Sequence, residues 1–291
     1  MEQFLAGGLA ACSAVTFTNP LEVIKTRLQL QGELKAHGVQ KTLRNIISDT
    51  IKQEGIRGIQ SGLLPAYYYQ FVMNACRLGS YEHIRQSLVA ANGGKSSHSI
   101  NIFSGATAGV FGAFMGSPLF LIKTRLQSNT IGTTKYGYQH GYTGIIDGFS
   151  KILKTEGFRG LYHGVDASML RTAVGSAVQL SVYDTIKKYF NTKFEKDTLK
   201  VHFSASMITG VFVCFFMNPF DVLTTRMYNQ GNHIYKNLVD CALKTVQTEG
   251  FLGLYKGVLA HYLRIGPHTI LTLTFLEFYK RHLIPVPSSL K

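Results

Sequence analysis

The stretch of sequence that decides the fold is Asn19-Pro-Leu-Glu-Val-Ile-Lys-Thr-Arg-Leu-Gln29, which occurs three times in related forms. The second copy is Ser117-Pro-Leu-Phe-Leu-Ile-Lys-Thr-Arg-Leu-Gln127, and the third is Asn218-Pro-Phe-Asp-Val-Leu-Thr-Thr-Arg-Met-Tyr228. Their prolines are 98 and 101 residues apart. Recurrence at a nearly fixed period indicates a chain built from copies of one structural unit.

Two shorter signatures follow in the same order in each unit. The first is Glu-Gly-x-x-Gly, which begins at Glu54, Glu156 and Glu249 and which we interpret as a turn signal, because it follows no strand that would make it a nucleotide loop. The second is an acid followed three positions later by a base near the end of the unit. We therefore divide the chain into three repeats, residues 1–91, 96–192 and 197–285.

Composition narrows the class of protein. The chain carries 30 Lys and Arg against 16 Asp and Glu, a formal charge of +14, yet only 16% of its residues are charged, against about 25% in soluble domains. The mean hydropathy is nevertheless close to zero. The four cysteines stand singly, without metal or disulfide spacing. The N-terminus lacks signal- and transit-peptide features, so we expect targeting information within the mature chain.

Each repeat is predicted to contain two long helices joined by a short one. The long apolar stretches exceed the roughly 20 residues that cross a bilayer, whereas connecting segments such as 42–53 have helical periodicity but are short and polar. Small residues at Gly7, Gly105 and Ser206 favour close helix packing in lipid. The stretches are Phe4–Leu30, Leu64–Ala90, Ile100–Gln127, Val165–Phe190, Leu199–Met227 and Gly257–Leu283.

Pro20, Pro118 and Pro219 fall within long helical patterns. A proline there removes one backbone hydrogen bond and kinks the helix. The alternative is that each proline simply ends its helix, but the helical pattern continues beyond Pro20. We therefore predict three kinked helices.

The motif Pro-x-acid-x-x-base-x-base, present three times over the whole chain, resembles that of the mitochondrial carrier family. The resemblance implies an all-α membrane protein with six transmembrane helices in three pseudo-threefold repeats and three short matrix helices. It implies a multi-pass transporter of the mitochondrial inner membrane that works as a monomer by alternating access to one central site. Both termini would face the intermembrane space. No arrangement of residues suggests an enzyme or a metal site.

In this family the acid of one motif pairs with the first base of the next, and the pairs close a gate on the matrix side. The acid and base of each motif lie three residues apart, on one face of the helix. The resemblance therefore implies that Glu22 pairs with Lys123 and that Asp221 pairs with Lys25.

The third pair of the matrix gate departs from the family pattern, because Phe120 and Thr224 stand where an acid and a base are expected. Losing both partners avoids an unpaired buried charge. We predict a gate with two ionic links, which opens more easily than one with three. Gln29 and Gln127 match the glutamine that braces these pairs in the family, and Tyr228 does not.

A second set of acid–base pairs ends the three repeats and is expected to form a cytoplasmic gate. A single pair spaced by three is an ordinary surface ion pair, but threefold recurrence favours a gate. The members are Glu82, Arg85, Asp184, Lys187, Glu277 and Lys280.

Substrate ligands are expected where the repeats differ, because a small substrate lacks threefold symmetry. Counting back 13, nine and five residues from the acids of the cytoplasmic gate gives positions that are polar and unequal among the repeats. The predicted substrate-binding residues are Arg77, Arg171, Arg264, Tyr69, Met73, Gln179 and His268.

The three arginines of this set, Arg77, Arg171 and Arg264, lie in the middle of apolar stretches without an acidic partner of their own in the repeat. Charge inside a membrane indicates a functional site, and arginine binds carboxylates and oxyanions with two hydrogen bonds. The predicted ligand is a small dianion. The alternative is that these arginines extend to the lipid headgroups. His268 is either a substrate or proton ligand or a packed histidine.

Resemblance within the family narrows the substrate. Arg77-Leu-Gly79 and Arg264–Thr269 resemble the dicarboxylate and oxoglutarate branch, while Ala66–Gln70 and Tyr235–Cys241 resemble members that carry oxaloacetate. The implied substrates are oxaloacetate, sulfate and malonate-type dicarboxylates. Tyr69 replaces a third arginine, which leaves the preferred dianion open. Dicarboxylate/phosphate exchange, oxoglutarate-type exchange, antiport or proton symport, and an uncoupling-type proton leak also remain open.

The expected partners, besides the substrate, are lipids. Tyr162-His-Gly164 and Tyr255-Lys-Gly257 resemble the sequence at which family members bind cardiolipin through amides at helix N-termini. Gln60–Gly62 departs from it in the first repeat. We expect cardiolipin as a bound structural lipid, and no cofactor. A nucleic-acid partner would suit the charge of +14, but no aromatic–basic stripe recurs, so none is expected.

Overall fold

The computed structural model describes residues 2–33, 41–131, 134–193, 199–231 and 234–283, and all regular structure in these ranges is helical. Each repeat contributes two long helices, as the sequence predicts, and the bounds agree within a few residues. The long helices are α1 (Glu2–Leu30), α3 (Leu63–Ala91), α4 (His98–Ser128), α7 (Val165–Lys193), α8 (Leu199–Asn229) and α10 (Val258–Leu283).

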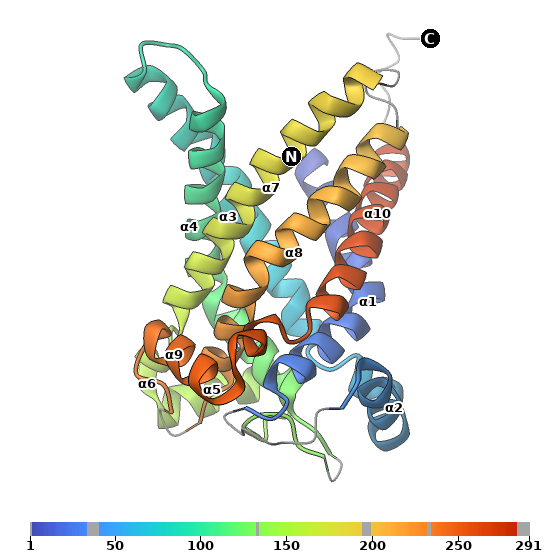
Figure 1. The fold of residues 1–291 in the computed structure, drawn as a ribbon, viewed down its shortest axis with the longest axis vertical. Helices are drawn as coiled ribbons and strands as arrows, with labels where there is room; N and C mark the ends of the chain where they lie inside the picture. Colours follow the sequence, from blue (N-terminus) through green and yellow to red (C-terminus); the bar gives the residue numbers. More distant parts are fainter. Residues whose placement is uncertain (1, 34–40, 132–133, 194–198, 232–233, 284–291) are drawn as a thin grey trace.

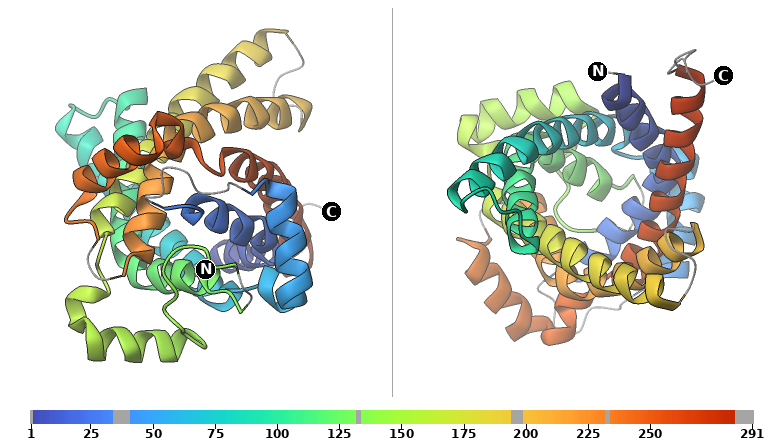
Figure 2. Two further views of the ribbon diagram at one scale, coloured as in Figure 1. Left: turned by 60° about the horizontal axis from the view of Figure 1, so that its bottom comes forward. Right: turned by 90° about the horizontal axis from the view of Figure 1, so that it is seen from above.

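The six long helices form a closed ring in the order α1, α3, α4, α7, α8, α10 and back to α1 (Figure 2). The short helices lie together at one end of this ring, which we call the short-helix end; the long helices spread apart toward the opposite, open end (Figure 1). The short helices are α2 (Leu43–Ile59), α5 (Ile145–Thr155), α6 (Gly157–Gly160), α9 (Leu238–Glu249) and the 3-10 turn η1 (Phe251–Tyr255). The predicted carrier-type fold is confirmed.

Small residues on α4 let its two neighbours approach closely, as expected for helices that pack in lipid. A Cβ atom at Gly105 would lie 2.6 Å from a methyl carbon of Leu180 on α7. A Cβ atom at Gly112 would lie 2.9 Å from the sulfur of Met73 and 3.0 Å from its carbonyl oxygen on α3. The second of these contacts involves backbone, so α3 and α4 could not keep this spacing with a larger residue there.

The three motif prolines lie inside continuous helices. α1 continues ten residues beyond Pro20, and α4 and α8 continue equally far beyond Pro118 and Pro219. The alternative that these prolines end their helices is therefore excluded. The second base of each motif, one turn or more beyond its proline, is thereby placed at the short-helix end.

That second base anchors each repeat. Arg27 donates to both carboxylate oxygens of Glu54, at 2.7 and 2.8 Å, and its Nε donates to the carbonyl of Gln127 in the next repeat at 3.2 Å. The pairs of Arg125 with Glu156 and of Arg226 with Glu249 repeat this arrangement. The glutamate of Glu-Gly-x-x-Gly, interpreted from sequence only as part of a turn, is therefore also an ion-pair partner.

The turn interpretation itself is correct, and the environment of one glutamate can be described outside the spans. Gly55, Gly157 and Gly250 have φ between 64° and 75°, the left-handed region that glycine adopts most easily. Burial favours protonation of Glu156, but the Arg125 guanidinium outweighs it and holds the pKa of that carboxyl below its ordinary value.

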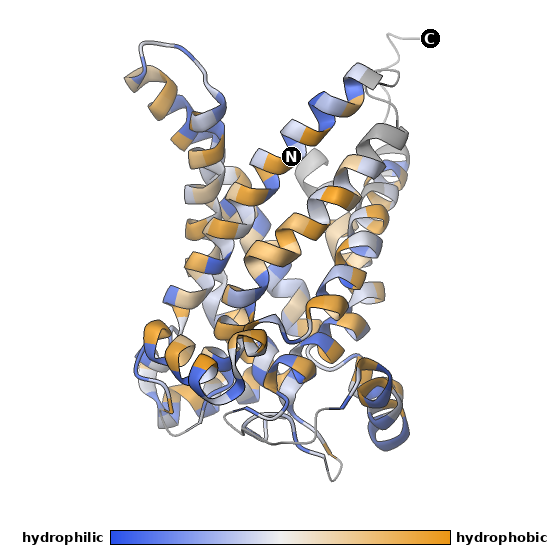
Figure 3. Ribbon diagram, viewed as in Figure 1, coloured by the Kyte–Doolittle hydropathy of each residue, from blue (hydrophilic) through white to orange (hydrophobic). Residues whose placement is uncertain are grey.

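Among the described residues, two helical segments are long and apolar enough to cross a membrane, judged by length and composition: His98–Ser128 and Ser204–Asn229. The middle of α8 is predominantly hydrophobic (Figure 3), and Phe212, Phe215 and Phe216 are exposed on it. The other long helices carry more charge. On α1, Glu22, Lys25 and Arg27 are buried, so the average hydropathy of this helix is a poor measure of the surface that it exposes.

Candidate functional site

Both ion pairs predicted for the matrix gate are formed. Lys123 Nζ lies 2.8 Å from Glu22 Oε2 and joins α4 to α1, while Lys25 Nζ lies 2.6 Å from Asp221 Oδ2 and joins α1 to α8. All four side chains are buried. The pairs lie toward the short-helix end, where they close the ring interior by linking neighbouring repeats.

The third position of this ring is aromatic. Phe120 is buried with its ring centroid 4.9 Å from that of Tyr69 and 5.4 Å from that of Tyr228. Lys123 Nζ lies 5.2 Å from the Phe120 centroid, within cation–π range. Thr224 donates its hydroxyl to the Phe220 carbonyl of its own helix at 2.7 Å. Phe120 and Thr224 thus supply no ionic link, but apolar and cation–π contacts fill the interface.

Gln29 and Gln127 differ in what they contact. Gln29 donates to Asp221 Oδ2 at 2.6 Å and accepts a hydrogen bond from Thr225 at 2.7 Å, so it contacts a gate carboxylate directly. Gln127 accepts from Thr26 at 3.0 Å and donates to Asn19 at 3.2 Å. It links α4 to α1 beside the Glu22–Lys123 pair.

Two of the predicted substrate arginines contact the gate acids. Arg171 Nε lies 2.5 Å from Asp221 Oδ1, and Arg264 Nη1 lies 3.7 Å from Glu22 Oε1. The expectation that they have no acidic partner is therefore wrong: a long arginine side chain reaches a motif acid on another helix. Within the described part of the chain, Arg77 has no acid within ion-pair distance.

The gate and the two arginines form one buried charge cluster. Its cations are Lys25, Lys123, Arg171 and Arg264, and its anions are Glu22 and Asp221. In their ordinary ionisation states, four positive charges meet two negative ones, which leaves a surplus of two positive charges. A low-dielectric interior makes such a surplus costly unless an anion offsets it.

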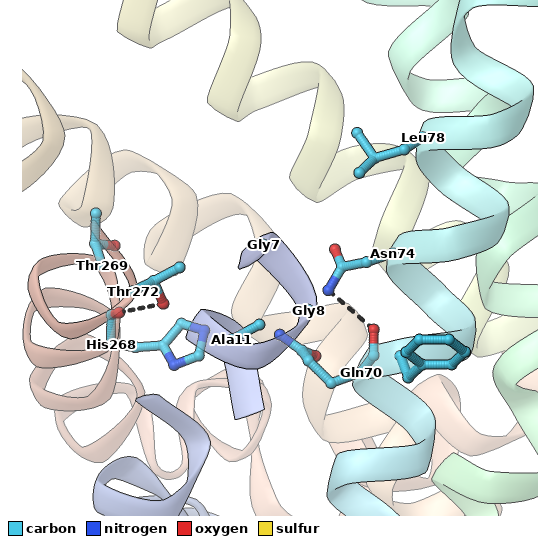
Figure 4. Close-up of a pocket in the computed structure, with 10 residues that line it drawn as sticks. Gly7, Gly8, Ala11, Gln70, Asn74, Leu78, His268, Thr269 and Thr272 are labelled. Atoms are coloured by element: carbon cyan, nitrogen blue, oxygen red, sulfur yellow. Dashed lines mark hydrogen bonds between the residues drawn. The ribbon is translucent and has the colours of Figure 1, made fainter. Parts of the chain in front are cut away.

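A pocket of about 330 Å³ lies between α1, α3 and α10 (Figure 4). Gly7, Gly8 and Ala11 form its wall on α1, where the absence of large side chains leaves the space open. Figure 4 shows polar side chains from α3 and α10 on opposite sides of this wall. They are Gln70, Asn74, His268, Thr269 and Thr272.

Gln70 and Asn74 were missed by the sequence analysis, which placed Tyr69 and Met73 in the site. Tyr69 and Met73 are only 8% and 9% exposed and pack against α4. Tyr69 also contacts the charge cluster, because Lys123 Nζ lies 5.8 Å from its ring centroid.

The remaining predicted residues, His268 and Gln179, form no ion pair with the cluster in the described part of the chain. His268 lines the pocket, and its Nδ1 lies 3.3 Å from the Thr18 hydroxyl on α1. Gln179 is exposed on α7. His268 therefore contacts another helix through a polar group, which a purely apolar packing role does not require.

At the open end, the two acids whose ion-pair contacts the structure describes, Glu82 and Asp184, do not pair with the predicted gate bases of another helix. Glu82 accepts from Arg85 within α3 at 3.3 Å, and Asp184 lies 3.3 Å from His98 on α4, its neighbour in the ring. Glu277 is exposed on α10, and the Lys280 side chain lies outside the described residues. The contact between His98 and Asp184 thus links α4 to α7 at this end, but it is not one of the predicted acid–base pairs.

Residues 1–92, 94–194 and 195–286 each match the model of a sequence family described as "Mitochondrial carrier protein". The chain belongs to the mitochondrial carrier family. Its matches include the mitochondrial oxaloacetate transport proteins of Saccharomyces cerevisiae and Schizosaccharomyces pombe, each 49% identical over 94% of this chain and over 87% and 88% of the relative. The mitochondrial citrate transporter E of Aspergillus niger is 45% identical over 94% of this chain and 91% of the relative.

Membership identifies the two ends of the carrier. The short helices of this family lie on the matrix side of the mitochondrial inner membrane, so the ion pairs of Glu22 and Asp221 close the matrix end. The opposite end is spread apart (Figure 1). The carrier is thus in a matrix-closed conformation.

Proposed function

We propose that this carrier exchanges small dianions, with oxaloacetate, sulfate and malonate-type dicarboxylates as its substrates, across the mitochondrial inner membrane. The observation that carries the proposal is the surplus of two positive charges in the buried cluster. A dianion offsets this surplus, whereas a monoanion leaves one positive charge and a trianion adds a negative one. The names of the two yeast relatives support oxaloacetate as one of the dianions.

The substrate binds Arg171 and Arg264 and thereby replaces their contacts with the gate acids. Arg171 holds Asp221 and Arg264 lies beside Glu22 in the closed gate. A carboxylate or sulfate group binds a guanidinium with two parallel hydrogen bonds, which is a better geometry than the single contact each arginine makes here. Lys25 or Lys123 is then the only cation that each gate acid keeps, and Asp221 also keeps its hydrogen bond from Gln29.

Loss of the arginine contacts weakens the matrix gate and couples binding to opening. A ligand shifts a conformational equilibrium only by its difference in affinity for the two states. The dianion supplies this difference, because its contacts with Arg171 and Arg264 replace contacts that hold the gate shut. Closure at the other end, through the acid–base pairs of α3, α7 and α10, completes alternating access.

The part of the pathway toward the open end selects substrates by their size and hydrogen-bonding groups. Arg77 and the pocket residues Gln70, Asn74 and His268 provide donors toward the open end. Arg77 attracts the anion from solution, and the polar pocket side chains receive its carboxylate or carbonyl oxygens. The substrate then moves to the charge cluster.

Structural lipid is part of the same proposal. Gly164 and Gly257 directly precede α7 and α10, and the first amides of a helix have no carbonyl acceptor within that helix. Such ends attract phosphate. Cardiolipin retained through purification, and lost from carriers with Gly164→Pro or Gly257→Pro, is the expected result in lipid mass spectrometry.

The test is exchange in proteoliposomes with a panel of monoanions, dianions and citrate. Dianion exchange is expected to exceed both other classes, and Arg171→Ala or Arg264→Ala is expected to reduce it at least tenfold. Arg44→Ala, an exposed arginine on α2, is the matched control and keeps the wild-type rate. Wild-type exchange of sulfate and oxaloacetate by Arg171→Ala would refute the site, and citrate exchanged faster than every dianion would refute the charge matching.

A further inference from the structure

His261 is a buried polar residue that the proposed transport cycle does not use. It lies in the first turn of α10, is 0% exposed, and donates its backbone amide to the Gly257 carbonyl at 2.9 Å. Neither ring nitrogen has a hydrogen-bond partner within the described structure. Buried polar groups are almost always bonded, so an imidazole with two unbonded nitrogens calls for a functional reason.

Packing does not explain this histidine. The equivalent positions, sixteen residues before the acid at the open end of each repeat, are Ala66, Ser168 and His261, and all three are buried. The threefold fold thus accepts a small residue here in two repeats. The third repeat carries instead a side chain that can bind a proton near neutral pH.

Four charged residues, on α1, α7, α8 and α10, surround the His261 ring. Its Nδ1 lies 4.0 Å from Asp221 Oδ2 on α8. Lys25 on α1, Arg171 on α7 and Arg264 on its own helix also act on the ring electrostatically. Asp221 is the one negative group near the ring, and Lys25 and Arg171 already pair with it. A further positive charge on His261 is therefore unfavourable while the gate is closed.

Opening of the gate reverses this balance. Lys25 separates from Asp221 when α1 and α8 move apart, and in the proposed cycle Arg171 turns to the substrate. Asp221 would then have lost both cationic partners, and a carboxylate beside a low-dielectric protein interior is stabilised by a neighbouring positive charge. His261 is the neighbouring group on α10 that can supply a replacement positive charge, and a movement of about one ångström brings it into hydrogen-bond range.

We propose that His261 binds one proton from the matrix each time the matrix gate opens and thereby replaces Lys25 and Arg171 as the partner of Asp221. The proton returns to the matrix when the gate closes, so each cycle is balanced without net proton transfer. The inference rests on the proposed anion exchange and makes the opening step dependent on pH.

The test is exchange of sulfate for sulfate in proteoliposomes, with equal pH on both sides between about pH 6 and pH 8, where sulfate stays dianionic and histidine titrates. The wild-type rate is expected to fall with rising pH by up to about tenfold per unit, the limit for one proton. His261→Gln is expected to give a flat profile at the slow, high-pH rate, and His261→Lys a flat profile at the fast rate. His282→Gln, an exposed histidine of α10, keeps the wild-type slope.

The outcomes separate this inference from the proposed function. No sulfate or oxaloacetate exchange by the wild type refutes anion transport itself. Exchange that is flat with pH in the wild type refutes the role of His261, and this result needs no variant to fold. A wild-type slope retained in His261→Gln refutes it equally. If His261→Lys is as slow as His261→Gln while both unfold thermally like the wild type, the role is structural and the inference is wrong.

Discussion

Replacing Glu249 by glutamine is expected to destabilise this carrier more than the same change in either other repeat. Glu249 accepts from both terminal nitrogens of Arg226, at 2.7 and 2.8 Å, and from Lys256 Nζ at 2.6 Å. Its side chain is 1% exposed. Glu249→Gln keeps the shape of the side chain but removes the charge that offsets two buried or half-buried cations.

The expected magnitude follows from burial. Removing one partner of a buried ion pair costs about 3–5 kcal/mol, and Glu249 belongs at the upper end because it serves two cations. Glu54 is 5% exposed and serves Arg27 alone, so Glu54→Gln belongs near about 3 kcal/mol. Glu156 is 25% exposed, and solvent screening reduces the expected cost of Glu156→Gln to about 1–2 kcal/mol.

Thermal unfolding of the purified carrier in one detergent measures this order. A loss of several kcal/mol corresponds to a fall in Tm on the order of 10 °C, which is large enough to separate the three variants. Asp166→Asn, an exposed acid of α7, is the control and is expected to change stability by no more than about 0.5 kcal/mol. Equal shifts in all three repeats, or the largest shift in Glu156→Gln, would show that burial and the second cation do not set the cost.

Three further results are expected. Phe120→Glu combined with Thr224→Lys should form the missing ion pair: the double variant should be more stable than the sum of the single variants predicts, by about 1 kcal/mol, and should exchange anions more slowly, whereas additive stabilities would count against a pair. Tyr228→Phe removes the hydrogen bond to Ser117 at 2.8 Å and should cost about 1 kcal/mol in chemical unfolding; an unchanged midpoint is the opposing result. Burial and the nearby Arg125 charge lower the pKa of His140 from 6.5 to about 4. Between these pH values the unfolded chain binds more protons than the folded chain, so the stability of the carrier should fall as the pH drops through them. His140→Gln should lessen that fall, and parallel stability profiles of the variant and the wild type would contradict the argument.

The fold and the gate pairs were predictable because they are encoded by repetition. Glu22, Lys25, Lys123 and Asp221 stand at fixed places in a threefold unit, and resemblance to the family implied which acid pairs with which base. The contact of Arg171 with Asp221 was not predictable in this way. It depends on side-chain reach between helices that no sequence spacing relates.

The pocket was predicted only in part for a different reason. Counting from Glu82 selected one position in each turn of α3, including Tyr69 and Met73, and so passed over the adjacent pocket residues Gln70 and Asn74. The ion pair between Arg27 and Glu54 was not predicted, although equivalents of both residues occur in all three repeats. The glycine that follows the glutamate already explained the motif as a turn.

The loss of the third ion pair bears on transport rather than on gate strength alone. Removing an acid and a base together leaves the charge surplus of the cluster at two, so the match to a dianion is preserved; losing only one partner would have changed the surplus by one. What changes is the environment of Arg171, which lies 5.3 Å from the Phe120 centroid while it binds Asp221. An acid at position 120 would compete with the substrate for this arginine, and an aromatic ring stabilises the guanidinium through cation–π contact without neutralising it. Phe120 thereby keeps Arg171 available to an anion, which makes the departure from the family motif part of the substrate site as well as of the gate.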